Sequence, residues 1–310
     1  MIATPMDVLK EFPIRKNKKQ KQAFREAVQS YCEGLGYSVS TEKGSMGARN
    51  VVIGSPETAK YLVTAHYDTP AAMILPNLIT PCSFWCFLGY QLAATALFLA
   101  IAAIPILPLS FTGLSDKVLS VIWLCCLYAL LGIMMLGPAN KNNANDNTSG
   151  VVTVLEVASS IPSSVRDQVC FILFDLEEAG MFGSAAYAKD HKTQVKEQIV
   201  LNFDCVGEGD YLLIIPTKKL RKNPSAMEKL KAVTCDEKKS LHLQEKGFSV
   251  YPSDHGNFPL AASIAALKKS KRGILYCDKI HTVKDTVLDE QNVIFLRDRL
   301  IALISGNAAE

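Results

Sequence analysis

The run Val169–Phe174 (VCFILF) restricts the fold of this chain more than any other stretch. An unbroken apolar run of this length is typical of a strand buried on both faces, as in the parallel part of an α/β sheet. It ends in acid, because Asp175, Glu177 and Glu178 place three carboxylates within four positions. Ligands of open α/β sheets collect at the carboxyl ends of strands, so these acids lie where a chemical site is expected.

Adjacent carboxylates such as Glu177 and Glu178 constrain their surroundings. They are not both readily ionised in a dry crevice unless a cation is close or one of them takes a proton. A solvated acidic turn after a core strand would explain this segment equally well by itself. The functional interpretation therefore depends on whether other residues of metal-ligand type follow other strands.

Two further predicted strands end in such residues. His66 and Asp68 come directly after the strand predicted at Lys60–Ala65, where Asp68 is placed to orient the imidazole of His66. Asp204 directly follows the apolar strand predicted at Ile199–Phe203. A single histidine or aspartate after a strand commonly has no special role, so the weight lies in their number.

Two more candidates lie in loops. Asp146 lies in a polar loop that opens the helix predicted at Val151–Ser159, where an N-cap would explain it as well. His281 follows the strand predicted at Gly273–Tyr276. These loops add a carboxylate and an imidazole to the set.

Strands and helices alternate along the rest of the chain. Amphipathic helices are predicted at Lys18–Leu35 and Asp289–Ile304, and further strands at Tyr37–Thr41, Asn50–Gly54 and Tyr211–Ile215. The sequence therefore predicts a mixed α/β fold with a mostly parallel central sheet flanked by helices. One edge of that sheet should gather the six candidates, namely His66, Asp146, Glu177, Glu178, Asp204 and His281. Two imidazoles with several carboxylates match a site for two borderline divalent cations that share one carboxylate.

Five motifs carry a family resemblance in this order: AHYDT, NDNTSG, DLEEAGMFGS, NFDCVG and IHTVKDT. As an ordered set they resemble the zinc aminopeptidases of family M28, over roughly residues 18–75 and 138–305. The resemblance implies a zinc exopeptidase-like fold, two Zn²⁺ ions and a peptide substrate with a free N-terminus. It implies a first zinc on His66 and Asp204, a second on Glu178 and His281, and Asp146 as the bridge between them.

The remaining roles also come from the resemblance. Glu177 would be the catalytic general base, close to the metals without binding them. Asp254, His255 and Phe258 match a family SDHxxF segment that lines the substrate pocket.

A long apolar insertion separates His66 from Asp146. Its two segments, Pro81–Ile104 and Val118–Leu136, are each about 20 residues long, roughly the length needed to cross the 30 Å of a bilayer core. They predict a transmembrane hairpin at residues 81–137, inserted between parts 1–80 and 138–310 of one catalytic domain. A soluble helical subdomain or a dimerisation arm is the alternative.

The distribution of charge and cysteine sets the expected compartment. Lys and Arg are abundant beside the hairpin and scarce in its loop, which places the catalytic domain on the cytoplasmic side. Nine cysteines without a CxxC pair favour reduced thiols in the cytosol. Residues 1–25 lack the pattern of a signal peptide. The net charge of +3 is too small to indicate nucleic-acid binding, and basic clusters such as Lys16–Lys21 are interpreted as solvated surface.

The leading hypothesis is a membrane-anchored dinuclear zinc aminopeptidase, a hydrolase that releases N-terminal residues from peptides. A glutaminyl-cyclase-like acyltransferase on the same fold is one alternative. Such relatives use a single zinc and lack a ligand at the position of the first histidine, so the presence of His66 favours the peptidase. A non-catalytic, membrane-attached partner-binding module is another, but no candidate ligand is missing from the sequence. Homo-oligomerisation stays open.

Overall fold

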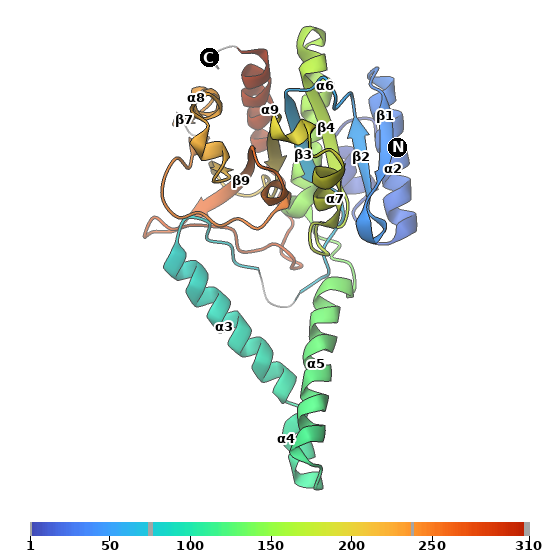
Figure 1. Ribbon diagram of the computed structural model, residues 1–310, viewed down its shortest axis with the longest axis vertical. Coiled ribbons are helices and arrows are strands. Elements are labelled where there is room, and N and C mark those ends of the chain that lie inside the picture. Colours follow the sequence, from blue (N-terminus) through green and yellow to red (C-terminus); the bar gives the residue numbers. More distant parts are fainter. Residues whose placement is uncertain (1, 74–76, 237–238, 307–310) are drawn as a thin grey trace.

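The computed structural model describes residues 2–73, 77–236 and 239–306. Its strands are β1 (Val39–Lys43), β2 (Arg49–Ile53), β3 (Tyr61–His66), β4 (Val169–Phe174), β5 (Ile199–Phe203), β6 (Tyr211–Pro216), β7 (Cys235–Asp236), β8 (Ser240–Leu243), β9 (Ala261–Lys269) and β10 (Leu275–Tyr276). Within the described residues they form one ten-stranded sheet in the order β1-β2-β4-β3-β5-β9-β6-β8-β7, with β10 paired to β9 (Figure 1).

The centre of the sheet is parallel. β4, β3, β5 and β9 run in the same direction, so their carboxyl ends lie at one edge, whereas β1, β2 and β6 run against their neighbours in part or in full. Every residue of β3 and β4 is buried, which is the pattern of strands covered on both faces. The predicted mixed α/β fold with a mostly parallel central sheet is therefore confirmed.

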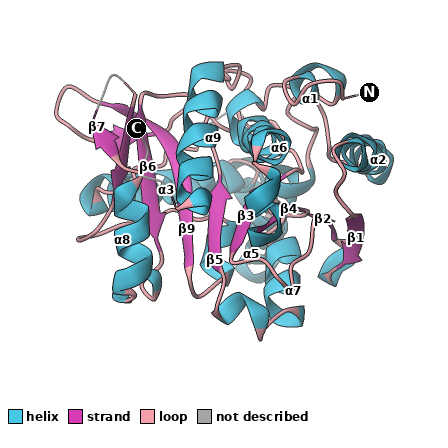
Figure 2. Cartoon of the chain, turned by 90° about the horizontal axis from the view of Figure 1, so that it is seen from above, coloured by secondary structure: helices cyan, strands magenta, loops and turns pink. Residues whose placement is uncertain are grey.

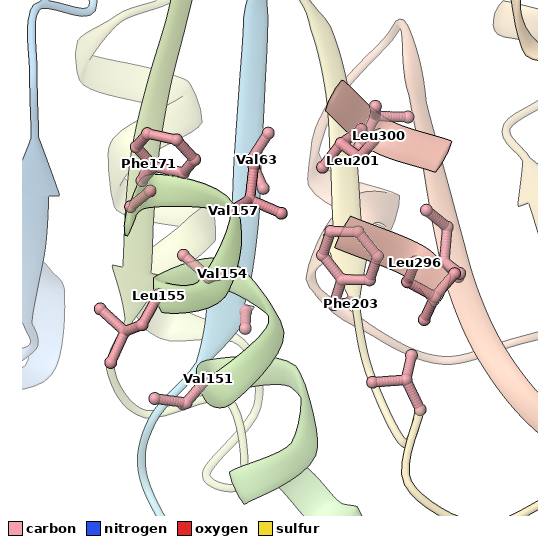
Figure 3. Close-up of a cluster of buried hydrophobic side chains, with 14 of the residues drawn as sticks. Val63, Val151, Val154, Leu155, Val157, Phe171, Leu201, Phe203, Leu296 and Leu300 are labelled. Atoms are coloured by element: carbon pink, nitrogen blue, oxygen red, sulfur yellow. The ribbon is translucent and has the colours of Figure 1, made fainter. Parts of the chain in front are cut away.

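Helices cover both faces of the sheet. The α-helices of the described residues are α1 (Asp7–Glu11), α2 (Lys18–Gly34), α3 (Phe84–Ala103), α4 (Ile106–Leu109), α5 (Asp116–Leu136), α6 (Gly150–Ser160), α7 (Phe182–Asp190), α8 (Pro224–Ala232) and α9 (Glu290–Ser305), of which α3, α4 and α5 lie away from the sheet. Figure 2 shows α6 and α9 on one side of the sheet and α7 on the other. The larger core lies under α6 and α9, where Val157 lies beside Val63, Leu300 beside Leu201 and Leu296 beside Phe203 (Figure 3).

Two stretches differ from the predicted elements. The sequence pattern indicates no strand at β9, yet β9 has nine residues and lies between β5 and β6 in the sheet. The strand predicted at Gly273–Tyr276 shortens to the two residues of β10, which pair with the end of β9.

The two long apolar helices, α3 and α5, project away from the sheet and meet again near α4 (Figure 1). Both are long and apolar enough to cross a membrane, and of their described residues Ala102 alone is buried. At their base the chain closes on itself, because Ala72 N–H donates to Pro138 O at 2.8 Å and Asn140 N–H donates to Pro70 O at 2.9 Å. We call this pairing, residues 70–73 with 138–140, the neck of the hairpin.

Candidate metal centre

The candidate ligands come from five segments of the chain that meet at the carboxyl edge of the parallel strands. His66 ends β3, and Asp204 directly follows β5. Asp146 lies in the loop before α6, and the peptide bond that follows it is cis. His66, Asp146 and Asp204 are 1%, 3% and 5% exposed, so the ligand atoms lie in a space largely closed to solvent.

One group of ligand atoms surrounds His66. Its Nε2 lies 3.3 Å from Asp146 Oδ1 and 3.9 Å from Asp204 Oδ1. The three ligand atoms all lie within 4.8 Å of one another. One imidazole with two carboxylates, at this spacing, is a donor set that suits a borderline divalent cation.

A second group surrounds His281, in the loop after β10. Its Nε2 lies 3.0 Å from Asp146 Oδ2 and 3.3 Å from Glu178 Oε2. Asp146 therefore directs one carboxylate oxygen to each group. The other oxygen of Glu178 is buried and, within the part of the chain described, has no hydrogen-bond partner. An orphaned carboxylate oxygen in this position fits a cation better than it fits an ordinary polar core.

The electrostatics of the cluster also call for positive charge. Burial raises the pKa of Glu178 well above its ordinary value, and the neighbouring charge of Asp146 raises it further. Burial acts in the same direction on Asp146, but hydrogen bonds from His281 and His66 outweigh it and hold its pKa below the usual range. A bound cation would remove the cost of keeping these carboxylates ionised away from water.

Glu177 lies beside the two groups that share Asp146, and its carboxylate forms a third group of close ligand atoms with His66 and Glu178. Its Oε2 is 3.9 Å from His66 Nε2, and burial raises its pKa well above the ordinary value, against the opposing charge of His66. The backbone of this acidic turn is held by Asp68, whose Oδ1 and Oδ2 accept from the N–H groups of Glu177 at 3.0 Å and Glu178 at 3.2 Å. The backbone oxygen of Asp68, at 3.2 Å, lies nearer to His66 Nδ1 than its carboxylate does, at 3.7 Å.

Two residues that position the ligands escaped the motif analysis. Asp285 accepts hydrogen bonds from the N–H of Asn145 at 2.7 Å and of Asp146 at 3.0 Å, which fixes the bridging loop. Ser253 donates its hydroxyl to Asp204 Oδ2 at 2.5 Å. Asp285 is the acidic residue of the motif IHTVKDT, which also contains His281, and this position in the motif is the signal that could have identified it.

Arg15 is a third such residue, and no motif marks it. It is fully buried, and it donates to the backbone oxygen of Tyr67 at 2.5 Å and to Thr148 Oγ1 at 3.0 Å. Burial lowers its pKa to about 10, so the guanidinium stays charged at neutral pH. It thereby ties the exit of β3 to the loop that carries Asp146.

The segment expected to line the substrate pocket divides into three environments. His255 lies in the wall of a cavity of about 560 Å³ beside the cluster. Asp254 is fully buried and accepts from Ser184 Oγ at 2.5 Å, so it lies behind that wall. Phe258 stacks on Phe174, with ring centroids 5.7 Å apart, as part of the core.

The third acid of the turn, Asp175, is paired within the fold. Its Oδ1 lies 2.6 Å from Nζ of Lys21 on α2, and both side chains are at least nine-tenths buried. The prediction that Lys16–Lys21 is a solvated face is therefore wrong at Lys21, because the turn of α2 that carries it packs against the end of β4.

Comparisons with known proteins identify a matching family and a similar protein. A family model described as peptidase family M28 matches residues 131–294. Aminopeptidase Y of Saccharomyces cerevisiae is 27% identical over 115 residues, which are 36% of this chain and 20% of that protein. The chain thus covers a fifth of the length of that relative.

Solved structures match nearly the whole chain. The LapA aminopeptidase of Legionella pneumophila has a TM-score of 0.58 at 15% identity, covering 99% of this chain and 72% of that one. A leucine aminopeptidase precursor of Bacteroides thetaiotaomicron has a TM-score of 0.59 at 16% identity, covering 97% and 94%. The glutaminyl cyclase of Porphyromonas gingivalis has a TM-score of 0.59 at 14% identity, covering 98% and 96%. At these identities the likeness is one of fold.

Replacing Lys21 with Met should destabilise the protein by about 3 kcal/mol, because it leaves the buried carboxylate of Asp175 without its cation. Chemical denaturation at neutral pH measures the change. Lys19→Met is the matched control, since Lys19 is exposed on the same helix and should change the free energy of unfolding by less than about 0.5 kcal/mol. Equal effects of the two substitutions would show that the pair contributes nothing specific.

Proposed function

The chain belongs to peptidase family M28, and we propose that it is a zinc-dependent aminopeptidase that hydrolyses the N-terminal residue from peptides. The observation that supports this most directly is the pair of ligand groups that share Asp146. An isolated acidic turn would not bring two histidines from distant loops to opposite oxygens of one buried carboxylate.

In this proposal two Zn²⁺ ions occupy the two groups. His66 and Asp204 hold the first, Glu178 and His281 hold the second, and Asp146 bridges them. When bound, the ions would supply Lewis-acid polarisation of the scissile carbonyl and of the attacking water.

Glu177 would be the general base. Its carboxylate lies next to the groups without belonging to the ligand pair proposed for either ion, and its backbone is fixed by Asp68. It would accept the proton of the attacking water and deliver it to the leaving amine.

The substrate side of the site comes from the segment that carries Asp254, His255 and Phe258. His255 would contact the substrate from the cavity wall. Asp254 adds a buried carboxylate close to the cluster, and Phe258 supports the wall from the core. Asp254 lies outside the proposed ligand set, and its Oδ2 has no partner among the described residues, so this carboxylate suits the α-ammonium group of a peptide.

A second candidate, glutaminyl cyclisation, is favoured by the likeness of fold to the Porphyromonas gingivalis enzyme. A peptide that begins with glutamine separates the two reactions. Release of free glutamine supports the peptidase, whereas loss of ammonia with retention of the first residue supports the cyclase. A metal-free protein that performs neither reaction would instead support the non-catalytic partner-binding module.

We further propose that residues 81–137 anchor the enzyme in a lipid bilayer. The exposed apolar surfaces of α3 and α5 support this, as does the neck, which returns the chain to the side from which it left. Parts 1–80 and 138–310 would then form one catalytic domain on the cytoplasmic side.

Glu177→Gln should lower kcat for aminoacyl-anilides by about 100- to 10,000-fold, because the amide cannot take a proton from water. Zinc content should remain near that of the wild type, which elemental analysis measures. Glu33→Gln, at an exposed carboxylate of α2, serves as the control and should change neither quantity. A parallel loss of zinc would mean that Glu177 is a ligand and not the base.

Asp146→Ala should remove both ions, since one oxygen of this carboxylate lies in each group. Elemental analysis of the purified variant should give close to no zinc, and activity should be lost with it. Retention of the wild-type metal content would contradict the bridging role, and retention of half of it would mean that Asp146 serves one ion alone.

Removing residues 88–134 and joining the ends with a short Gly/Ser linker should move the protein from the membrane fraction to the soluble fraction. The neck stays in place, so the variant should still bind zinc and unfold cooperatively. Fractionation and thermal denaturation measure the two outcomes. A variant that stays in the membrane fraction contradicts the anchor, and one that fails to fold means that the hairpin is part of the domain core.

A further inference from the structure

The cavity of about 560 Å³ adjoins the candidate metal centre. Its wall includes Met181, which lies in the turn that follows Glu178, and Ser253, whose hydroxyl donates to Asp204. Its size is in the range of pockets that hold small ligands. A group held at the centre would therefore extend directly into this space.

The charged side chains in the wall of this cavity are cationic. Lys218 and Arg221 belong to the wall, whereas the described residues that line it include neither aspartate nor glutamate. Within the described part of the chain, neither cation forms an ion pair with a carboxylate. This contrasts with Lys268 and Lys279, whose ammonium groups both pair with Glu208.

Arg221 is held in position by neutral oxygens. Its Nη1 donates to Gly247 O at 3.1 Å and its Nη2 to Ser249 Oγ at 2.5 Å, while its buried Nε has no partner among the described residues. These bonds fix the guanidinium but leave its charge uncompensated. His255 presents a second unsatisfied group in the same wall, because its buried Nδ1 has no hydrogen-bond partner in the part of the chain that is described, and the residue is 7% exposed.

The rest of the wall is largely apolar. Ile215, Pro216 and Val250 contribute to it, as does Phe248, which packs on Phe84 at the base of α3 with ring centroids 5.2 Å apart. In such surroundings water screens a charge less than at an open surface. An anion with a short apolar stem is the ligand that suits both parts of the wall.

We propose that this cavity binds a carboxylate of the peptide substrate through Lys218 and Arg221, and so makes the enzyme selective for acidic substrates. The proposal rests on the aminopeptidase function proposed above. The carboxylate can come from a first side chain of aspartate or glutamate, or from the C-terminus of a dipeptide. A first residue with a cationic side chain is disfavoured in either case.

An anionic lipid headgroup is the alternative ligand, because the base of the hairpin lies close by. The position of Ser253 and His255 favours the peptide. These residues extend the cavity from Arg221 towards the candidate metal centre, so the cationic wall and the site proposed for peptide hydrolysis share one space.

The test compares kcat/KM of the zinc-loaded full chain for Glu-, Leu- and Lys-anilides, and for Leu-Leu against Leu-Leu-amide. We expect Glu-anilide to be preferred over Leu-anilide, and Lys-anilide to be the poorest. Lys218→Gln should lower kcat/KM for Glu-anilide by about fivefold, the upper range for an exposed ion pair, with little effect on Leu-anilide. Lys218→Glu should reverse the preference. Lys219→Gln is the matched control, because Lys219 is exposed like Lys218 but lies outside the wall.

The other outcomes have distinct meanings. Preference for Leu-Leu over its amide, lost in Lys218→Glu, assigns the carboxylate to the C-terminus of the substrate and supports the proposal. Equal cleavage of all anilides together with equal cleavage of Leu-Leu and Leu-Leu-amide, both unchanged in Lys218→Glu, overturns the proposal and leaves the peptidase intact. Weaker co-sedimentation of Lys218→Glu with phosphatidylglycerol vesicles, while the anilide and Leu-Leu ratios stay unchanged, assigns the charge to lipid and also overturns it. Absence of any cleavage overturns both proposals.

Discussion

The burial of four carboxylates at one sheet edge is the constraint on which the other features of this molecule depend. Asp146, Glu177, Glu178 and Asp204 lie together with only two imidazoles among them. Charges held away from water must be paired or neutralised, so this edge is unfavourable without further cations. Arg15 beneath the cluster and Lys21 at its rim offset part of that cost through fixed charges. The carboxylates whose charge is still unbalanced are those whose oxygens converge on the two groups. A metal centre therefore accounts for the geometry better than a polar core does.

The neck explains how the chain accommodates a long insertion next to the sheet edge that carries the candidate ligands. The neck joins the segment that precedes α3 to the segment that follows α5. The two helices therefore lie outside the closed domain and contribute almost nothing to its core. The pairing also reaches the ligand loops, since Met73 N–H donates to the backbone oxygen of His281 at 2.7 Å. The side chain of Asn140 donates to the backbone oxygen of Thr282 at 2.9 Å. The neck therefore supports the loop of one candidate ligand, while α3 and α5 remain outside the core of the domain.

The sequence predicted those elements whose composition alone determines their burial. β3, β4 and β5 consist of large apolar residues, so they are recognised as buried strands, and the acids at their ends follow from counting along the chain. β9 is as central, but its buried part is rich in alanine, which is depleted in strands, and only its pairing with β5 and β6 makes it one. Arg15 was missed for a similar reason, because its partners are backbone and hydroxyl oxygens far away in the sequence. Long-range pairing leaves no local pattern.

The two charged regions of the site are complementary to the two ends of one kind of ligand. The cluster edge holds two carboxylates outside the proposed ligand pairs, Glu177 and Asp254, whereas the adjoining cavity carries Lys218 and Arg221 without a carboxylate in its described wall. A peptide with a free ammonium group and a nearby carboxylate would satisfy both regions at once, and in one orientation only. Reversing it would place ammonium beside guanidinium and carboxylate beside carboxylate, and each of these like-charge contacts is unfavourable. The carboxylates at the cluster edge and the cations of the cavity wall would therefore attract such a peptide and also orient its first peptide bond towards Glu177.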